Sequence, residues 1–535
     1  MESAIRMDSP ICLIENRIER GRAKLVVNPE AVNILSNIHQ PVVVVSIVGM
    51  YRTGKSYLMN RLAGAQKGFS LGSTIQSQTK GIWMWCVPHP MYKDRALVLL
   101  DTEGLGDVEK GDKKNDSKIF ALAVLLSSAL VYNSLGTINQ DALDKLKFVG
   151  EITELIKVRT GSIPDEQATF STYFPIFVWA VRDFNLELEI DGKTVSADGY
   201  LENALKFKTP ERSPEDKEYN ELRNRLRMYF GNRRCFVFDA PTDSRKQLKE
   251  LEHLPDDRLD KVFVAQSALF CEYIFKNAEV KRVDITVDVT GYRLGELAKL
   301  YTDAINSSNV ACLEEAVVSL AEKENKIAIQ EATEHYEKRM RTVVMPTETL
   351  KYFLYLSSWF EDEAWEKFLK RSIKDKDQKF LKEFAEKVER MRMEFNTMNE
   401  AESREVCAAL IQKHSAGFER GLAVGTFRKP GGHGKFKRSL KAVEEKYNRE
   451  RGKGVKAEEV LQQYMMSKQA AEIIIIQEDN ALSQKQKEKE VMNNKKQMEQ
   501  MKARLQEMEG EQHKSAEEMA NLRATAQQLQ RMLGQ

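Results

Sequence analysis

The chain has 535 residues, of which 82 are Lys or Arg and 80 are Asp or Glu, so its formal net charge is +2. This length predicts several domains, and the near-neutral charge gives no reason to expect nucleic acid as a partner. The six cysteines lie far apart, without the spacing of a disulfide framework or a metal finger. Residues 1–22 lack the apolar core of a secretory signal, and the longest apolar stretch, 120–132, is too short to span a bilayer. These features predict a soluble cytosolic protein.

Short apolar runs alternate with helical patterns in the first part of the chain. Residues 41–48, 96–100, 175–181 and 235–238 have the composition of buried strands, and residues 118–130 have a helical pattern. Buried strands separated by helices are typical of a mostly parallel α/β sheet. We therefore predict an α/β domain here.

The remainder of the chain is poor in residues that interrupt helices. Eleven of the 13 prolines occur at or before Pro255, and no glycine occurs between Gly295 and Gly417. Proline and glycine cost about 3 and 1 kcal/mol in a helix interior, so their absence predicts long helices. The predicted domains are an α/β domain at 1–305, a helical middle domain at 306–477 and a short C-terminal helical domain at 478–535.

An apolar seam with alternating spacings of three and four residues follows Val491. Its apolar members are Met498, Met501, Leu505, Met508, Met519, Leu522, Ala526, Leu529 and Leu533, and the polar residues Asn494, Gln512 and Ser515 occupy the intervening seam positions. A repeat of 3.5 residues suits a helix that packs along a partner. The partner is either the helical part of the same chain or a second molecule in a coiled coil, and both alternatives stay open from the sequence.

Residues 49–56 read GMYRTGKS and match the phosphate-binding pattern GxxxxGK[ST]. The motif follows the strand pattern 42–48 and precedes a helical stretch, 57–62, which is the context that a P-loop requires. Backbone N–H groups of such a loop surround the β-phosphate. Lys55 would neutralise the β- and γ-phosphates, and Ser56 would bind Mg²⁺. The residues predicted to bind nucleotide here are Gly49, Tyr51, Arg52, Thr53, Gly54, Lys55, Ser56 and Tyr57.

A second motif, Asp101-Thr102-Glu103-Gly104, follows the apolar run 96–100. Asp101 would hold Mg²⁺ through a water, and the N–H of Gly104 can donate to the γ-phosphate. The hydroxyl-rich segment 73–80 lies between the two motifs, where a switch loop belongs. A threonine in such a loop completes the Mg²⁺ shell only while the γ-phosphate is present.

The usual guanine-reading motif, [NT]KxD, is absent after the later strands. The strand pattern 174–181 ends instead in Arg182-Asp183. The Asp183 carboxylate can accept hydrogen bonds from the N1–H and N2–H₂ groups of guanine, whereas adenine has no such paired donors. This favours GTP, and an ATP-using P-loop protein with a coiled-coil arm is the more remote alternative.

Four motifs in order resemble the guanylate-binding proteins, the interferon-induced large GTPases of the dynamin superfamily. They are Gly49–Ser56, Gln76–Trp83, Asp101–Gly106 and Val181–Asp183. The resemblance implies a GTPase head at 1–305 that hydrolyses GTP to GDP, or onward to GMP, with Mg²⁺. It further implies homodimers or larger assemblies through the head, assemblies with related GTPases, peripheral contact with vesicle or pathogen membranes, and a role in antimicrobial innate immunity. A nucleotide-gated scaffold with slow, incidental hydrolysis is the alternative function.

The resemblance also implies roles for individual residues. Arg52 matches the internal arginine finger of the family, Ser77 the residue that positions the attacking water, and Asp183 the guanine reader with Arg182 beside it. The expected catalytic residues are Arg52, Lys55, Ser77, Thr79 and Glu103, the expected metal ligands are Ser56, Thr79 and Asp101, and Gly104, Arg182 and Asp183 complete the nucleotide site.

Two departures from the family pattern bear on assembly and anchoring. In the segment that resembles the family's guanine cap, this chain has Ala240 where many members have Arg, so contacts between heads are expected to be weaker or differently built. No cysteine follows Cys407, so the CaaX prenylation of some family members is not expected. The tail is also short by family standards, which fits either a truncated chain or a naturally short member.

Overall fold

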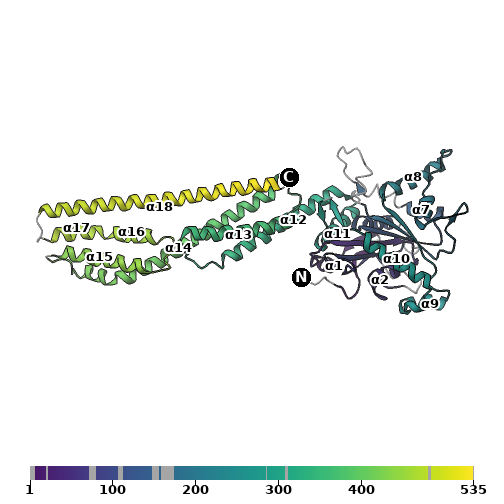
Figure 1. The fold of residues 1–535 in the computed structure, drawn as a ribbon, viewed down its shortest axis with the longest axis horizontal. Coiled ribbons are helices and arrows are strands. Elements are labelled where there is room, and N and C mark those ends of the chain that lie inside the picture. Colours follow the sequence, from purple (N-terminus) through teal and green to yellow (C-terminus); the bar gives the residue numbers. More distant parts are fainter. Residues whose placement is uncertain are drawn as a thin grey trace. The chain divides into compact units, whose positions relative to one another are not determined.

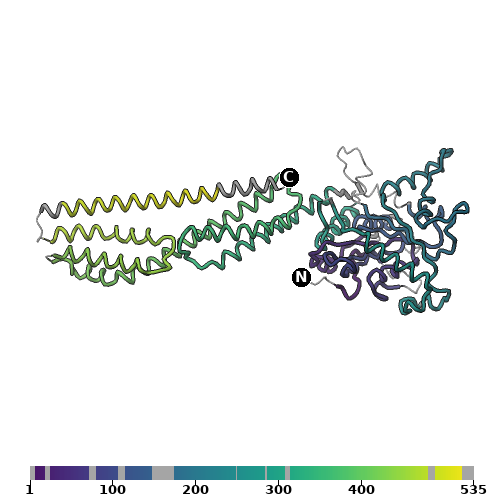
Figure 2. Tube along the Cα trace, in the orientation of Figure 1, coloured from purple at the N-terminus to yellow at the C-terminus, as the bar shows by residue number. Residues whose placement is uncertain are grey.

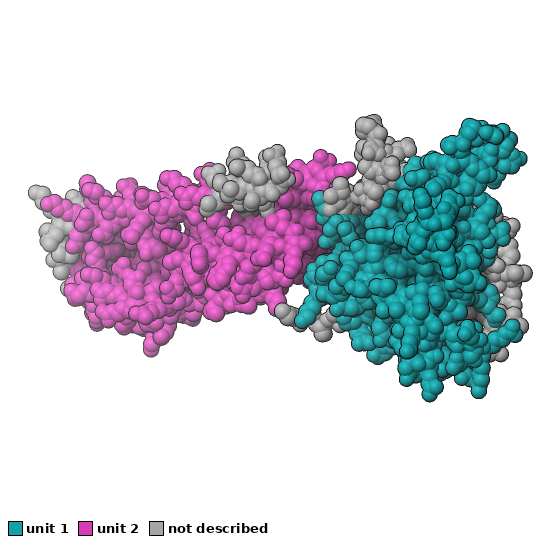
Figure 3. Space-filling model, turned by 45° about the vertical axis from the view of Figure 1, so that its right-hand side comes forward, with its two compact units in different colours: residues 1–323 teal, residues 324–535 magenta. Residues whose placement is uncertain are grey.

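The computed structural model describes residues 6–19, 22–71, 80–105, 113–147, 156–157, 174–284, 286–307, 311–429, 431–479 and 484–533. Two compact units divide the chain: unit 1 comprises residues 1–323 and unit 2 residues 324–535 (Figure 3). The division falls within one continuous helix, α12 (Leu313–Met340). The domain limits near residues 305 and 477 stay predictions.

An eight-stranded sheet forms the centre of unit 1 (Figure 1). Its order is β11-β8-β6-β3-β5-β4-β1-β2, with parallel pairing from β11 to β5 and antiparallel pairing from β5 to β2. The strands are β1 (Ile11–Glu19), β2 (Arg22–Val27), β3 (Val42–Gly49), β4 (Ile82–Pro88), β5 (Ala96–Thr102), β6 (Ala129–Leu135), β8 (Ile176–Arg182) and β11 (Arg233–Val237). The predicted mostly parallel α/β sheet is confirmed.

Helices shield the central strands from solvent. Every residue of β3 and β5 is buried, as expected for parallel strands that are covered on both faces. The helices of unit 1 are α1 (Pro29–Ser36), α2 (Lys55–Leu62), α3 (Lys113–Leu126), α4 (Gln140–Asp144), α7 (Ala197–Ala204), α8 (Pro214–Tyr229), α9 (Arg245–Lys249), α10 (Lys261–Asn277) and α11 (Gly291–Asn306). Short strands pair outside the main sheet: β7 (Ile156–Lys157), β9 (Glu189–Ile190), β10 (Lys193–Thr194), β12 (Arg282–Asp284), β13 (Val287–Asp288) and β14 (Ala311–Cys312).

The helical pattern predicted for residues 118–130 is wrong at its C-terminal end, because the last two residues belong to β6. At the end of the helix, the Ser127 hydroxyl and N–H donate to the carbonyl oxygen of Ala123 at 2.6 and 3.2 Å. The next residue, Ser128, already donates its N–H to the carbonyl oxygen of Val44 in β3 at 2.8 Å. Both segments are apolar and buried, so periodicity alone did not separate the helix from the strand.

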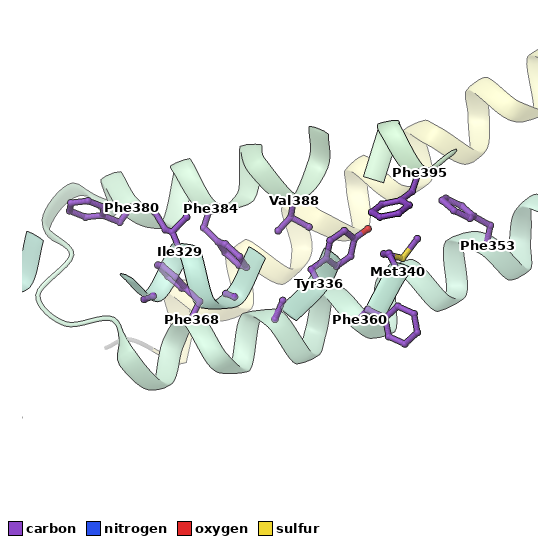
Figure 4. Packing of buried hydrophobic residues seen from close by; sticks show 13 residues of the cluster. Ile329, Tyr336, Met340, Phe353, Phe360, Phe368, Phe380, Phe384, Val388 and Phe395 are labelled. Carbon is purple, nitrogen blue, oxygen red and sulfur yellow. The ribbon is translucent and has the colours of Figure 1, made fainter. Parts of the chain in front are cut away.

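Unit 2 is helical, and the predicted long helices are confirmed. Among the described residues, no helix is both long and apolar enough to cross a membrane. An aromatic core joins α12, α13 and α14 (Figure 4), in which the rings of Phe368 and Phe384 stack at 4.9 Å. The helices after α12 are α13 (Leu350–Arg371), α14 (Lys379–Ala423), α15 (Gly432–Arg449), α16 (Ala457–Ser467), α17 (Gln469–Glu478) and α18 (Gln484–Leu533).

The last helix, α18, lies along the other helices of unit 2 (Figures 1 and 2). Between residues 491 and 519 its half-buried positions coincide with the seam predicted from the sequence: Asn494, Met498, Met501, Leu505, Met508, Gln512, Ser515 and Met519. Asn494 donates to the carboxylate of Glu472 in α17 at 3.1 Å. Of the two partners that the sequence left open, the structure therefore shows the chain's own helices.

Candidate nucleotide-binding site

The predicted nucleotide motifs meet at one edge of the sheet. The P-loop follows β3, Asp101 lies at the end of β5, and Arg182 ends β8. These three strands run parallel within the sheet, so their carboxyl ends face the same side. That edge is where open α/β sheets bind ligands.

The backbone of the P-loop is fixed by neighbours from β6. Gly49 has φ +152°, and a Cβ at this position would lie 2.1 Å from the carbonyl oxygen of Asn133. The side-chain amide of Asn133 donates to the carbonyl oxygen of Thr53 at 2.7 Å. Gly54 and Arg52 take left-handed conformations, with φ 78° and 61°. The loop therefore has a curved shape that the surrounding protein holds.

Lys55 and Ser56 begin α2 directly below this loop. The Lys55 ammonium donates to the carbonyl oxygen of Met50 at 3.1 Å, and the residue is only 7% exposed. The Ser56 hydroxyl donates to Oδ2 of the fully buried Asp101 at 2.6 Å. Two of the three predicted metal ligands are thus in direct contact. A hydroxyl and a carboxylate are the hard oxygen donors that Mg²⁺ prefers, so these residues fit that ion.

The second motif is docked against the P-loop at Gly104. A Cβ on this residue would lie 2.5 Å from Cα of Tyr51, so only glycine fits without a shift of the loop backbone. The next residue, Leu105, donates its N–H to the carbonyl oxygen of Gly49 at 3.0 Å and accepts from the N–H of Tyr51 at 3.3 Å. The backbone that would sense a γ-phosphate is therefore tied to the loop that would hold it.

Arg182 is buried among aromatic rings beside the loop. Its guanidinium carbon lies 5.2 Å from the ring centres of both Phe238 and Phe263, and the group donates to the carbonyl oxygen of Gly54 at 3.4 Å. Burial lowers the pKa of Arg182 to about 10, so the side chain remains a cation at neutral pH. The neighbouring Asp183 is exposed and has φ 53°. The buried arginine thus anchors a turn that presents the aspartate.

Glu103 is fully buried and lies within hydrogen-bond distance of three donors. Its carboxylate accepts from the N–H of Gly81 at 2.6 Å and from the side-chain amides of Asn16 and Asn115, each at 3.1 Å. Gly81 is the residue that directly follows the predicted switch segment 73–80. The carboxylate of Glu103 therefore connects three segments: β1, α3, and the residue that precedes β4.

The remaining predicted residues differ in how far the structure describes them. Arg52 is exposed, and its guanidinium carbon lies 5.2 Å from the ring centre of Tyr51. Tyr57 is buried against Phe263, with ring centres 5.6 Å apart. Ser77 and Thr79 lie outside the described residues.

Sequence reasoning missed the residues that support the site from a distance. Asn133 braces the P-loop, Phe238 and Phe263 surround Arg182, and Asn16 and Asn115 hold Glu103. Asn16 and Asn133 act on residues 87 and 80 positions away along the chain, so no local motif includes them. The one usable signal was Asn133, a polar residue directly after the apolar stretch 120–132.

Family models match both parts of the chain: the N-terminal domain of guanylate-binding proteins matches residues 22–283, and the C-terminal domain matches residues 286–535. The chain belongs to the guanylate-binding protein family. It is 49% identical to Guanylate-binding protein 1 of Homo sapiens over 95% of this chain and 86% of that protein. It is 46% identical to Guanylate-binding protein 6 of Homo sapiens over 98% of this chain and 84% of that protein. Guanylate-binding protein 1 of Chlorocebus aethiops is 50% identical over 92% of this chain and 83% of that protein.

Membership of the guanylate-binding protein family makes the chain a GTP-binding large GTPase of the dynamin superfamily. One departure from the family pattern is visible in the structure. Ala240, where the sequence resemblance leads one to expect Arg, is exposed. Its neighbour Asp239 is held by Gln266, whose amide donates to the Asp239 carboxylate at 2.9 Å.

Proposed function

We propose that this chain binds GTP with Mg²⁺ at the P-loop edge of the sheet and hydrolyses it to GDP. The observation that carries the proposal is the 2.6 Å contact between Ser56 and Asp101, next to the curved loop that ends at Lys55. Two motifs 45 residues apart in sequence supply hydroxyl and carboxylate oxygens to one point. A structural turn without a ligand would not require this convergence.

Different residues of the chain have different roles in phosphoryl transfer. Phosphoryl transfer depends on positioning and charge neutralisation more than on a strong base. The P-loop N–H groups and Lys55 bind the β- and γ-phosphates, and the N–H of Gly104 donates to the γ-phosphate. Ser56, Asp101 and Thr79 would hold Mg²⁺, which neutralises phosphate charge when bound. Ser77 orients the attacking water, and Glu103 acts as a positioning residue that fixes the backbone at Gly81.

Base recognition belongs to the turn after β8. Arg182 is held among rings and against the P-loop carbonyl of Gly54, so the position of Asp183 is coupled to that of the loop. An exposed carboxylate there accepts from the paired donors of guanine. This arrangement supports GTP over ATP.

Self-assembly completes the proposal. The exposed Arg52 acts as a finger once a second head orders its loop, and the product is GDP or, after a second cleavage, GMP. The same proposal includes four further properties, which rest on the family resemblance. They are homodimers, mixed assemblies with related GTPases, a role in cytoplasmic antimicrobial immunity, and peripheral membrane contact. Slow hydrolysis without assembly would favour the nucleotide-gated scaffold instead.

The first prediction is that Lys55→Ala abolishes GTP hydrolysis and tight GTP binding. The Lys55 ammonium is directed toward the inside of the P-loop, where it contacts the carbonyl oxygen of Met50. Its removal would leave the charge of the bound triphosphate without this compensation. Chromatography of nucleotide products, with GTP and ATP supplied in parallel, measures the activity, the base preference and the GDP-to-GMP ratio. Lys67→Ala, an exposed lysine just after α2, is the matched control and should behave as the wild type. Equal hydrolysis of GTP by Lys55→Ala would refute the proposed site.

A further inference from the structure

The outward face of α13 has a row of aromatic side chains that the core does not use. Tyr352, Tyr355 and Trp359 are 53%, 62% and 50% exposed. The rings of Tyr355 and Trp359 have centres 6.5 Å apart. Phe353 and Phe360 of the same helix fill the aromatic core of unit 2 (Figure 4), and the ring centre of Trp359 lies 6.2 Å from that of Phe360. Exposed rows of Tyr and Trp on a helix are typical of binding surfaces.

Two carboxylates continue this row. Asp362 and Glu366 follow Trp359 at spacings of three and seven residues, which place them on the same side of the helix. Both are exposed, and neither forms an ion pair with another described residue. We define the aromatic–acidic face of α13 as Tyr352, Tyr355, Trp359, Asp362 and Glu366.

The complementary chemistry lies on α15. Lys437, Arg438 and Lys441 are exposed on one side of this helix and form no ion pair with another described residue. Glu445 is the acidic residue that follows on that side. We define Lys437, Arg438 and Lys441 as the basic face of α15. Cations of this kind bind over the faces of Trp and Tyr rings, and their charge matches the two carboxylates of α13.

We propose that the aromatic–acidic face of α13 docks on the basic face of α15 in a second copy of this chain. Both faces are exposed, so the contact is not satisfied within one molecule. Two reciprocal contacts would close a symmetric dimer. Asp362 and Glu366 disfavour an anionic membrane as the occupant, because like charges repel. This interface lies wholly in unit 2 and does not rest on the proposed nucleotide chemistry.

Sedimentation of the nucleotide-free full chain at low salt tests the proposal without contributions from GTP-dependent contacts between heads. We expect a monomer–dimer equilibrium, which Trp359→Ser weakens by about tenfold or more, as for a central aromatic at an interface. Glu405→Lys changes an exposed charge on α14 that belongs to neither face and should leave the dimer unchanged. Circular dichroism confirms that each variant is folded.

A charge swap supplies the decisive comparison. Asp362→Lys with Glu366→Lys should abolish the dimer, and so should Lys437→Glu with Lys441→Glu. Mixing the two variant proteins should restore association, because each then supplies the face that the other lacks. A wild type that stays monomeric, or a mixture that fails to associate, overturns the proposal. Binding of wild-type monomers to neutral lipid vesicles that depends on Trp359 also overturns it and assigns the face to a membrane.

Discussion

Asp183 shows how a single residue is presented by its surroundings. Its φ of 53° is unusual for a residue with a side chain. Backbone hydrogen bonds hold the turn on both sides: the N–H of Gly136 donates to the carbonyl oxygen of Arg182 at 2.7 Å, and the N–H of Phe184 donates to that of Phe238 at 2.9 Å. The backbone that carries the Asp183 side chain is therefore held by the protein itself, which under the proposed function lowers the cost of base recognition.

We predict that Asp183→Asn weakens GTP binding by roughly two orders of magnitude or more, because an amide donor then faces the guanine donors. The same change should raise affinity for xanthosine triphosphate, whose C2 atom carries a carbonyl oxygen in place of the guanine amino group. Titration with fluorescent nucleotides measures both effects. Asp191→Asn is the matched control, since Asp191 is also exposed with φ 52°. An unchanged GTP preference would place base recognition elsewhere.

Lys281 is a buried lysine outside the nucleotide site. Its ammonium donates to the carbonyl oxygen of Ser127 at 2.8 Å, and burial lowers the pKa of Lys281 to about 7. Between pH 7 and about 10.5 the unfolded chain therefore binds more protons at this residue than the folded chain. The contribution of this residue to stability thus increases as the pH rises through that window.

We predict that Lys281→Met removes this contribution, which is on the order of 1 kcal/mol per pH unit. Urea unfolding midpoints of the wild type and the variant at pH 7 and pH 9 measure the difference in slope. The wild type should gain stability relative to the variant on going to pH 9. Parallel pH dependences of the two proteins would show that Lys281 titrates normally in the folded state.

At the scale of elements, α18 is attached near its start by a buried histidine. His433 in α15 is 3% exposed, and its ring lies 2.9 Å from the Glu472 carboxylate in α17 and 3.4 Å from the Glu490 carboxylate in α18. Asn494 of α18 donates to the same Glu472 carboxylate. One side chain thus links three helices of unit 2, whereas the seam positions of α18 from Met498 to Met519 are only half-buried.

We predict that His433→Ala loosens the attachment of α18. The loss of the hydrogen bond to Glu472 at a buried position costs on the order of 1–3 kcal/mol, and the 3.4 Å approach to Glu490 is lost with it. Amide hydrogen exchange in the first turns of α18 should accelerate by about tenfold or more, because exchange follows local opening. His513→Ala, on the exposed side of α18, is the control. Unchanged exchange in the His433 variant would mean that the apolar seam alone holds the helix.

At the scale of the whole molecule, activity should depend on protein concentration. Arg52 is exposed in the single chain, and the proposed function assigns it to catalysis only when a second head orders its loop. We predict that specific GTPase activity rises with protein concentration and that Arg52→Ala removes the rise, with Arg390→Ala on α14 as the control. Turnover per molecule that stays constant over a wide dilution series would contradict this mechanism. If the contact between heads and the contact through α13 form independently, Trp359→Ser should leave the concentration dependence of GTPase activity unchanged.

The sequence by itself determined the sheet class, the long helices, the nucleotide motifs and the seam of α18. These features depend on local chemistry: Gly49–Ser56 carries its phosphate-binding pattern within eight residues, and an apolar period of 3.5 specifies one face of a helix. The same local reasoning failed at residues 118–130, because a buried helix and a buried strand are both continuously apolar.

Only the tertiary structure decided which distant residues complete the site and what α18 packs against. Asn133 braces a loop 80 residues earlier, and Arg182 reaches Gly54 across 128 residues. Such pairs follow from the order of strands in the sheet, which brings the ends of β3, β6 and β8 together. The seam of α18 suited any apolar partner, and the connection through His433 selected the helices of its own chain. Contacts between residues far apart in the sequence depend on topology, and local patterns do not encode it.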